Sequence, residues 1–257
     1  MEIPAVIRPA KINRLLPYWA VFQADARQTL RSWVYRTWVL VFVLAAAGYS
    51  LFHGGVQHKA GMIQLASKLN SDLLRWTFLG SVTLIIVLTA GSISSERGTM
   101  ADSVLSRGIS RYQYFLAKWH ARLVTILGTF FAMGVVTLAS SFFLVQEDLS
   151  LIGSLVALLT IAVVLAVVVT CGVTVSAMSQ STVLAIAVLW ICLYGAGFAL
   201  WFLPSEPFSA KQFLSSLQYT LQGKYDIHDL GRLASWSSIA SCVVATVGLV
   251  CFSRRDV

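Results

Sequence analysis

The densest group of charged and hydroxyl-bearing residues in the chain lies between residues 94 and 111. Its charged members are Glu96, Arg97, Asp102, Arg107 and Arg111. The segment has no histidine, which argues against a lipid-modifying membrane enzyme with its proton-transfer groups here. Side chains of these types can instead form ion pairs and hydrogen bonds with a partner protein or with lipid headgroups.

The spacing of residues in this segment predicts a short helix. Thr99 and Asp102 have the T-x-x-D spacing of a helix N-terminus, and Asp102 also suits the positive end of the helix dipole. One apolar face over two turns then contains Met100, Ala101, Val104 and Leu105. Gly108 is suited to end this helix, and Ser110 with Gln113 predicts the start of the next one. A hydrophobic stripe below the bilayer requires a protein partner or the lipid surface.

The rest of the chain offers no recognisable site for chemistry. No G-x-x-x-x-G-K-[ST] motif occurs, so the chain itself is not expected to hydrolyse ATP. The four cysteines have neither paired nor metal-like spacing. His53, His58 and Met62 form a weak candidate metal site, which we weigh against a solvated loop. We expect no catalytic residue, no metal and no cofactor on this chain.

The composition indicates that these elements lie in a membrane. Apolar residues make up 57% of the 257 positions and charged residues only 12%, against about 25% charged in a soluble domain. Runs close to the roughly 20 residues that span a bilayer occur near 34–53, 75–94, 121–145, 151–178, 182–203 and 234–252. The predicted fold is all-α, with residues 1–257 forming a single transmembrane domain of six spans.

The basic residues predict the orientation of these spans. With the N-terminus in the cytoplasm, only a minority of the 19 Lys and Arg fall on the outer side. These are Lys59, Lys68, Arg75, Lys211, Lys224 and Arg232. The positive-inside rule therefore favours both termini in the cytoplasm. Helix anchoring also explains the net charge of +8 better than a nucleic-acid partner does.

An amphipathic helix is predicted over residues 12–31, ahead of the first span. One face contains Leu15, Trp19, Phe22, Ala26 and Leu30. Other faces contain Gln23, Arg27, Gln28 and Arg31. A helix of this kind lies in the membrane plane as an elbow, either as a passive anchor or in contact with a cytoplasmic partner as well.

A second amphipathic helix is predicted in the outer loop, residues 204–233. Its apolar positions are Phe213, Leu214, Leu217 and Leu221. This helix is expected either to rest on the outer leaflet or to cap the bundle.

The segment between the second and third spans resembles the permease subunits of ABC-2 type transporters. That family has a Glu, a Gly-Thr, a leucine-rich turn, a Pro-x-Ser-Arg and a Lys before the third span. The matching residues here are Glu96-Arg97-Gly98-Thr99, Leu105-Ser106-Arg107, Ser110-Arg111 and Lys118, with Gly108 where the family commonly has Pro. The loop Gly223–Leu230 and the ending Phe252–Val257 are also similar, so the resemblance extends from the elbow helix to the tail.

The resemblance implies that the short helix is a coupling helix. It would dock in a cleft of a separate ABC nucleotide-binding (ATPase) subunit, which binds the ATP and Mg²⁺. The implied interface comprises Glu96, Arg97, Thr99, Met100, Asp102, Val104, Leu105, Arg107 and Arg111. Glu96 and Arg97 would form the hinge at the membrane surface. The simpler interpretation is that these residues only form the turns of a cytoplasmic loop and bind lipid headgroups.

The family also implies a dimer, with a second permease copy or a homologue, in a bacterial or archaeal inner or plasma membrane. Close helix contacts could use Gly80, Gly128, Gly134, Gly195 and Gly197. We expect most of these glycines to pack within one chain rather than between two.

The resulting functional prediction is the permease subunit of an ATP-driven exporter. The interiors of the predicted spans contain no Asp or Glu, which argues against a proton-coupled carrier and favours a hydrophobic or amphiphilic cargo. The main alternative is a non-transporting membrane module of the same fold, in a mechanical or sensory complex. An ATPase stimulated by cargo would separate the two.

Overall fold

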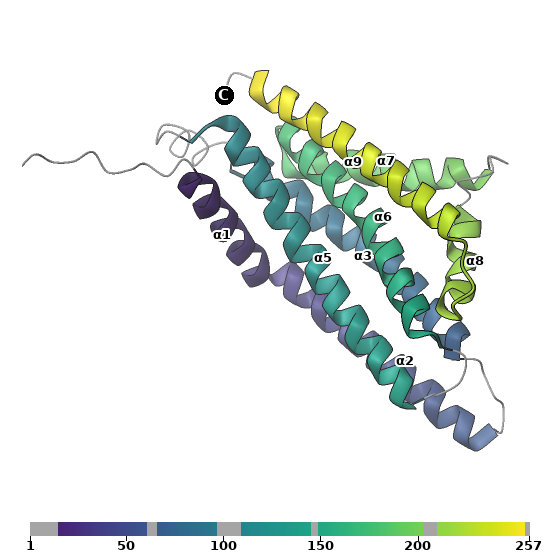
Figure 1. Cartoon of the computed structure of the whole chain (residues 1–257). Coiled ribbons are helices and arrows are strands. Elements are labelled where there is room, and N and C mark those ends of the chain that lie inside the picture. Colours follow the sequence, from purple (N-terminus) through teal and green to yellow (C-terminus); the bar gives the residue numbers. More distant parts are fainter. Residues whose placement is uncertain (1–14, 61–65, 97–108, 145–148, 203–209, 255–257) are drawn as a thin grey trace, which may run out of the picture.

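The computed structural model of the chain describes residues 15–60, 66–96, 109–144, 149–202 and 210–254. Within these ranges the chain is helical and forms no strand. The helices are α1 (Leu16–Arg31), α2 (Trp33–Ala60), α3 (Ala66–Ser94), α5 (Arg111–Leu144), α6 (Leu151–Met178), α7 (Thr182–Phe202), α8 (Ala210–Leu221) and α9 (Ile227–Arg254). Figure 1 shows them as one bundle.

Six of these helices, α2, α3, α5, α6, α7 and α9, are long and apolar enough to cross a membrane. The predicted all-α class is therefore confirmed, with six helices of the length and apolarity that membrane spans require. Helix α6 has the predicted bounds, whereas α3 and α9 begin earlier than the predicted spans, at Ala66 and Ile227. Helix α5 begins at Arg111, ahead of the predicted span and next to the predicted start signal at Ser110. Hydropathy detects the apolar centre of a helix, while the backbone hydrogen bonds continue into its polar ends.

Helix α6 lies at the centre of the bundle. It packs against α3, α5, α7, α8 and α9, and Figure 1 shows it between α5 and α9. Leu158, Ile161 and Leu165 of α6 are fully buried. A helix that is hydrophobic on every side is expected to be surrounded in this way.

Small residues bring α6 close to its neighbours. Gly172 of α6 faces Thr89 of α3, whose side chain occupies the space that a Cβ would need. Among the glycines predicted to make close contacts, Gly134 does so against Leu158. The space beside the other four, Gly80, Gly128, Gly195 and Gly197, is open. The prediction that most of them pack within the chain is therefore wrong.

Helix α1 lies within the region of the predicted amphipathic helix, and residues 12–14 are outside the described part. It packs along the first part of α5 (Figure 1). Trp19 and Leu30 of the predicted apolar face are exposed, at 54% and 46%. The face toward α5 instead buries Asp25 and Thr29. Its placement in the membrane plane stays a prediction.

Helix α8 caps one end of the bundle, which agrees with one of the two roles predicted for it. It packs against α3 and α6, and Leu217 and Leu221 are buried there. Arg75 of α3 donates a hydrogen bond from Nε to the Leu214 carbonyl oxygen at 2.8 Å and pairs with Asp72 at 3.2 Å. This end of the bundle is thus held by both apolar burial and a charged hydrogen bond.

Candidate functional site

The structure describes the two ends of the predicted partner interface. Glu96 follows the end of α3, and Arg111 is the first residue of α5. The remaining predicted interface residues lie outside the described part of the chain: Arg97, Thr99, Met100, Asp102, Val104, Leu105 and Arg107. Glu96 and Arg111 thus flank the 97–108 segment, and each is held by helices of the bundle.

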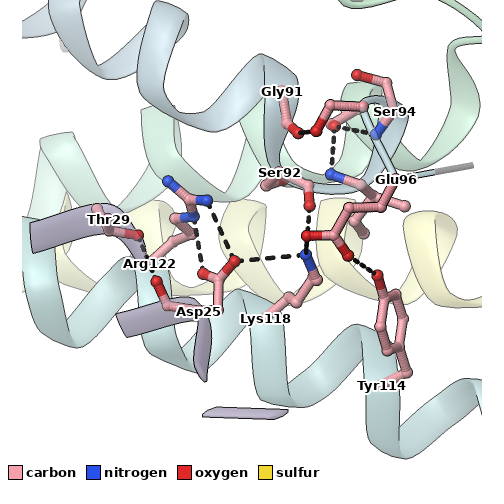
Figure 2. A network of polar contacts seen from close by, with 12 residues as sticks. Asp25, Thr29, Gly91, Ser92, Ser94, Glu96, Tyr114, Lys118 and Arg122 are labelled. Carbon is pink, nitrogen blue, oxygen red and sulfur yellow. Dashed lines mark hydrogen bonds and ion pairs between the residues drawn. The ribbon is translucent and has the colours of Figure 1, made fainter. Parts of the chain in front are cut away.

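Glu96 is held by two side chains of α5. Its Oε1 atom lies 2.6 Å from Nζ of Lys118, and its Oε2 atom accepts a 2.5 Å hydrogen bond from the Tyr114 hydroxyl. The Glu96 backbone N–H also donates to the Ile93 carbonyl oxygen at 3.2 Å. Charge-assisted contacts of this length fix the position and orientation of the carboxylate (Figure 2).

Lys118 connects Glu96 to α1. Its ammonium group is buried and donates to the Ser92 carbonyl oxygen at 2.6 Å and to Oδ1 of Asp25 at 3.4 Å, in addition to its ion pair with Glu96. A lysine ammonium has three N–H donors, so these three acceptors satisfy it fully. One side chain of α5 thereby joins α1, α3 and the start of the 97–108 segment.

Asp25 also forms a two-pronged pair with Arg122. The Nε and Nη2 atoms of Arg122 lie 2.8 Å and 3.1 Å from the two Asp25 oxygens. A third donor, Nη1 of Arg122, bonds to the Leu88 carbonyl oxygen of α3 at 3.0 Å. The Nη2 contact is a hydrogen bond, whereas the Nε contact is an ion pair without hydrogen-bond geometry.

We call these five residues, Asp25, Glu96, Tyr114, Lys118 and Arg122, the ionic network (Figure 2). Its two carboxylates and two basic groups balance in formal charge. Both basic groups are buried, as is Asp25, so each relies on the others for the solvation that water would supply. Removing one partner leaves the remaining buried charges uncompensated, so the network holds α1, α3 and α5 in one arrangement.

The other end of the 97–108 segment is also anchored. Ser110 caps α5, accepting a hydrogen bond from the Gln113 N–H, and its own N–H reaches the Gln113 side-chain oxygen. This confirms the predicted S-x-x-Q start. Arg111 donates from Nη1 to the Ser253 carbonyl oxygen at 3.3 Å, which ties the start of α5 to the end of α9.

An apolar cluster lies behind this anchor. Tyr114 stacks on Phe252 of α9 with ring centres 6.1 Å apart, and Phe115 is buried beside it. Ile93 of α3 and Val173 of α6 complete the contact. The Tyr114 ring and its hydroxyl thus serve two purposes, because the ring packs on α9 while the hydroxyl binds Glu96.

Tyr18 forms a separate polar contact between α1 and α5. Its hydroxyl lies 3.0 Å from Nδ1 of His120. Partial burial raises the pKa of Tyr18 above its usual value, so the phenol stays protonated and can donate to the imidazole. This contact lies on the same side of α1 as Asp25 and adds to the attachment of α1.

Sequence reasoning missed most of the network. Lys118 was identified only through the family resemblance, Arg122 was among the basic residues expected on the inner side, and Asp25 received no role. A usable signal was present, because Tyr114, Lys118 and Arg122 recur every four residues and share one face of a helix. The predicted spans contain no Asp or Glu, but the bundle nevertheless buries one carboxylate, because α1, which lies outside these spans, contributes Asp25.

Within the described ranges, no three His, Cys, Asp or Glu side chains are arranged to hold a metal ion. The side chains of His53, His58 and Met62, the weak candidate for a metal, lie outside the described part. The ionic network ties three helices, α1, α3 and α5, to the start of one connecting segment.

Comparison of the chain with models of protein families and with curated proteins gives no match to either.

Proposed function

We propose that the chain is the membrane-spanning permease subunit of an ABC-2 type exporter, driven by ATP hydrolysis on a separate nucleotide-binding subunit. The observation that carries the proposal is the attachment of Glu96 through Lys118 to Asp25. The 97–108 segment, where the coupling helix is predicted, begins directly after this anchor. A push on that segment would act on α1, α3 and α5 together.

The anchoring at Arg111 supports the same role. Both ends of the segment are fixed to the bundle, since Glu96 is held by α5 and Arg111 holds the second end to α9. Displacement of the segment would therefore be transmitted to helices on both sides of α6 rather than absorbed at a loose loop. This is the property that a coupling element needs.

The proposed partners follow from this mechanism. The ATPase subunit would receive Met100, Val104 and Leu105, with Asp102, Arg107 and Arg111 as polar contacts. A second permease copy or homologue would complete the translocation path, with a hydrophobic or amphiphilic cargo. The proposed location is a bacterial or archaeal inner membrane with both termini in the cytoplasm.

The test is co-purification of a nucleotide-binding subunit with the full chain from its native membrane. Replacing Val104 and Leu105 by Asp should abolish recovery of that subunit and of ATP hydrolysis while leaving membrane insertion intact. Ile227→Asp is the matched control, since Ile227 is 77% exposed at the opposite end of α9 from the Arg111 anchor. Retained ATPase in the double variant would refute the coupling role. ATP hydrolysis that does not respond to any exported cargo would favour the non-transporting module.

A further inference from the structure

The junction of α1 and α2 carries three exposed arginines, Arg27, Arg31 and Arg36. None of them forms an ion pair with an acid in the described part of the chain. The acid nearest to them in sequence is Asp25, which is buried on the side of α1 that faces α5. Their positive charge is therefore directed away from the bundle and available to another molecule.

The arginines of α1 lie beside an exposed apolar surface. Arg27 and Arg31 are four residues apart, so they share one side of the helix. At 3.6 residues per turn, that side borders the face on which Trp19 and Leu30 are exposed, and it is turned away from Asp25. A basic row next to an apolar row is typical of a helix at a lipid surface.

The position of α2 places Arg27 and Arg31 at the level of the headgroups, and Arg36, within the first turn of the apolar span, reaches that level through its long side chain. The apolar span begins at Trp33, which is 80% exposed. Tryptophan favours the boundary between headgroups and hydrocarbon. With a rise of 1.5 Å per helical residue and the extended Ser32 between the two helices, Arg27 lies roughly 10 Å along the chain from Trp33. The headgroup layer on each side of a bilayer is roughly 5–8 Å deep, and the length of an arginine side chain covers the remainder.

We propose that Arg27, Arg31 and Arg36 form a binding surface for the phosphate headgroups of anionic phospholipids. The guanidinium group binds phosphate oxygens in a forked geometry and is more weakly hydrated than an ammonium group. A protein partner fits less well, because Trp33 and Leu30 expose apolar surface at the same level, where acyl chains begin. Helix α1 is thus held by the ionic network on one side and by lipid on the other.

The experiment measures thermal stabilisation of the full chain, purified in detergent, by added lipid. Phosphatidylglycerol should raise the melting temperature more than phosphatidylcholine of the same chain length, and inorganic phosphate should have no effect. Arg27→Gln with Arg31→Gln should raise the phosphatidylglycerol concentration needed for half of the effect by about 30-fold, at about 1 kcal/mol per arginine. The matched control is Arg232→Gln with Arg254→Gln, which removes the same charge from exposed positions on α9.

The outcomes separate the proposal from its competitors. A control variant that loses as much response as the Arg27/Arg31 variant would show that only net charge matters, and would overturn the proposal. An equal response to phosphatidylcholine, or to inorganic phosphate, would overturn it as well. If the Arg27/Arg31 variant keeps its lipid response but no longer recovers the ATPase subunit, the arginines face a protein and the proposal is wrong.

Discussion

Nζ of Lys118 lies 2.6 Å from Oε1 of Glu96, so a residue near the start of α5 holds the residue that precedes the 97–108 segment. The same ammonium group contacts Asp25 of α1. The two helices that flank the segment are therefore joined by an ion pair at its base, and α1 is joined to both. The predictions below test how much the bundle depends on this arrangement and on the packing around it.

Asp25→Asn should destabilise the protein strongly. It leaves Lys118 and Arg122 buried beside a neutral side chain, and removing one member of a buried ionic group costs about 3–5 kcal/mol. Thermal denaturation of the purified chain measures the effect. Asp72→Asn is the control, because the Asp72–Arg75 pair is about one-third exposed and should contribute less than about 1 kcal/mol. Equal losses in the two variants would show that the ionic network does not stabilise the fold.

Glu96→Gln and Asp25→Asn should not have additive effects on stability. Both carboxylates bind the Lys118 ammonium, so the double variant should depart from additivity by about 0.5–3 kcal/mol. A double-mutant cycle on melting curves gives this coupling energy. Tyr114→Phe in place of Glu96→Gln provides the comparison, because the Tyr114 hydroxyl contacts Glu96 and forms no bond to Asp25. Additivity in the Glu96–Asp25 cycle would mean that Lys118 does not connect α1 to Glu96.

Gly172→Ala should separate α3 from α6. A Cβ at Gly172 would collide with the side chain of Thr89, which is fully buried and bonded to the Ile85 carbonyl oxygen. Overpacking of this kind costs about 1–3 kcal/mol. Gly80→Ala is the control, since nothing lies within 4 Å of the added atom. The control should be neutral or stabilising, and a lower melting temperature for Gly80→Ala than for Gly172→Ala would contradict the packing described here.

Leu217→Ala should destabilise the bundle through α8. Leu217 is only 2% exposed against α3 and α6, and truncating a buried leucine to alanine costs about 2–5 kcal/mol. Tyr219→Ala, at a position on the same helix that is 60% exposed, should have a small effect. If both variants melt at the wild-type temperature, α8 rests on lipid and does not cap the bundle.

The spans could be predicted from the sequence because the bilayer sets both their length and their composition. Residues 151–178 illustrate this, since the predicted run and helix α6 coincide. The start of α5 could also be predicted, because the S-x-x-Q spacing of Ser110 and Gln113 alone specifies the two capping hydrogen bonds. The starts of α3 and α9 could not be predicted in this way, since their polar ends carry no hydropathic signal.

The ionic network could be predicted only in part. Glu96 and Lys118 were identified through a resemblance, but their pairing requires the tertiary contact of two helices. Asp25 was missed because the amphipathic pattern of α1 directs attention to its apolar face. The face that packs on α5 is the polar one, since the partners it meets there are Lys118 and Arg122.

The most direct test of the coupling mechanism is labelling of the 97–108 segment. Met100→Cys, in a chain whose four native cysteines are replaced by Ala, would be treated with a membrane-impermeant thiol reagent in sealed vesicles of each orientation. We predict labelling only from the cytoplasmic face, with protection when the ATPase subunit is bound and a change in that protection upon addition of ATP. Labelling from the outer face, or labelling that the ATPase subunit and ATP leave unchanged, would contradict the mechanism.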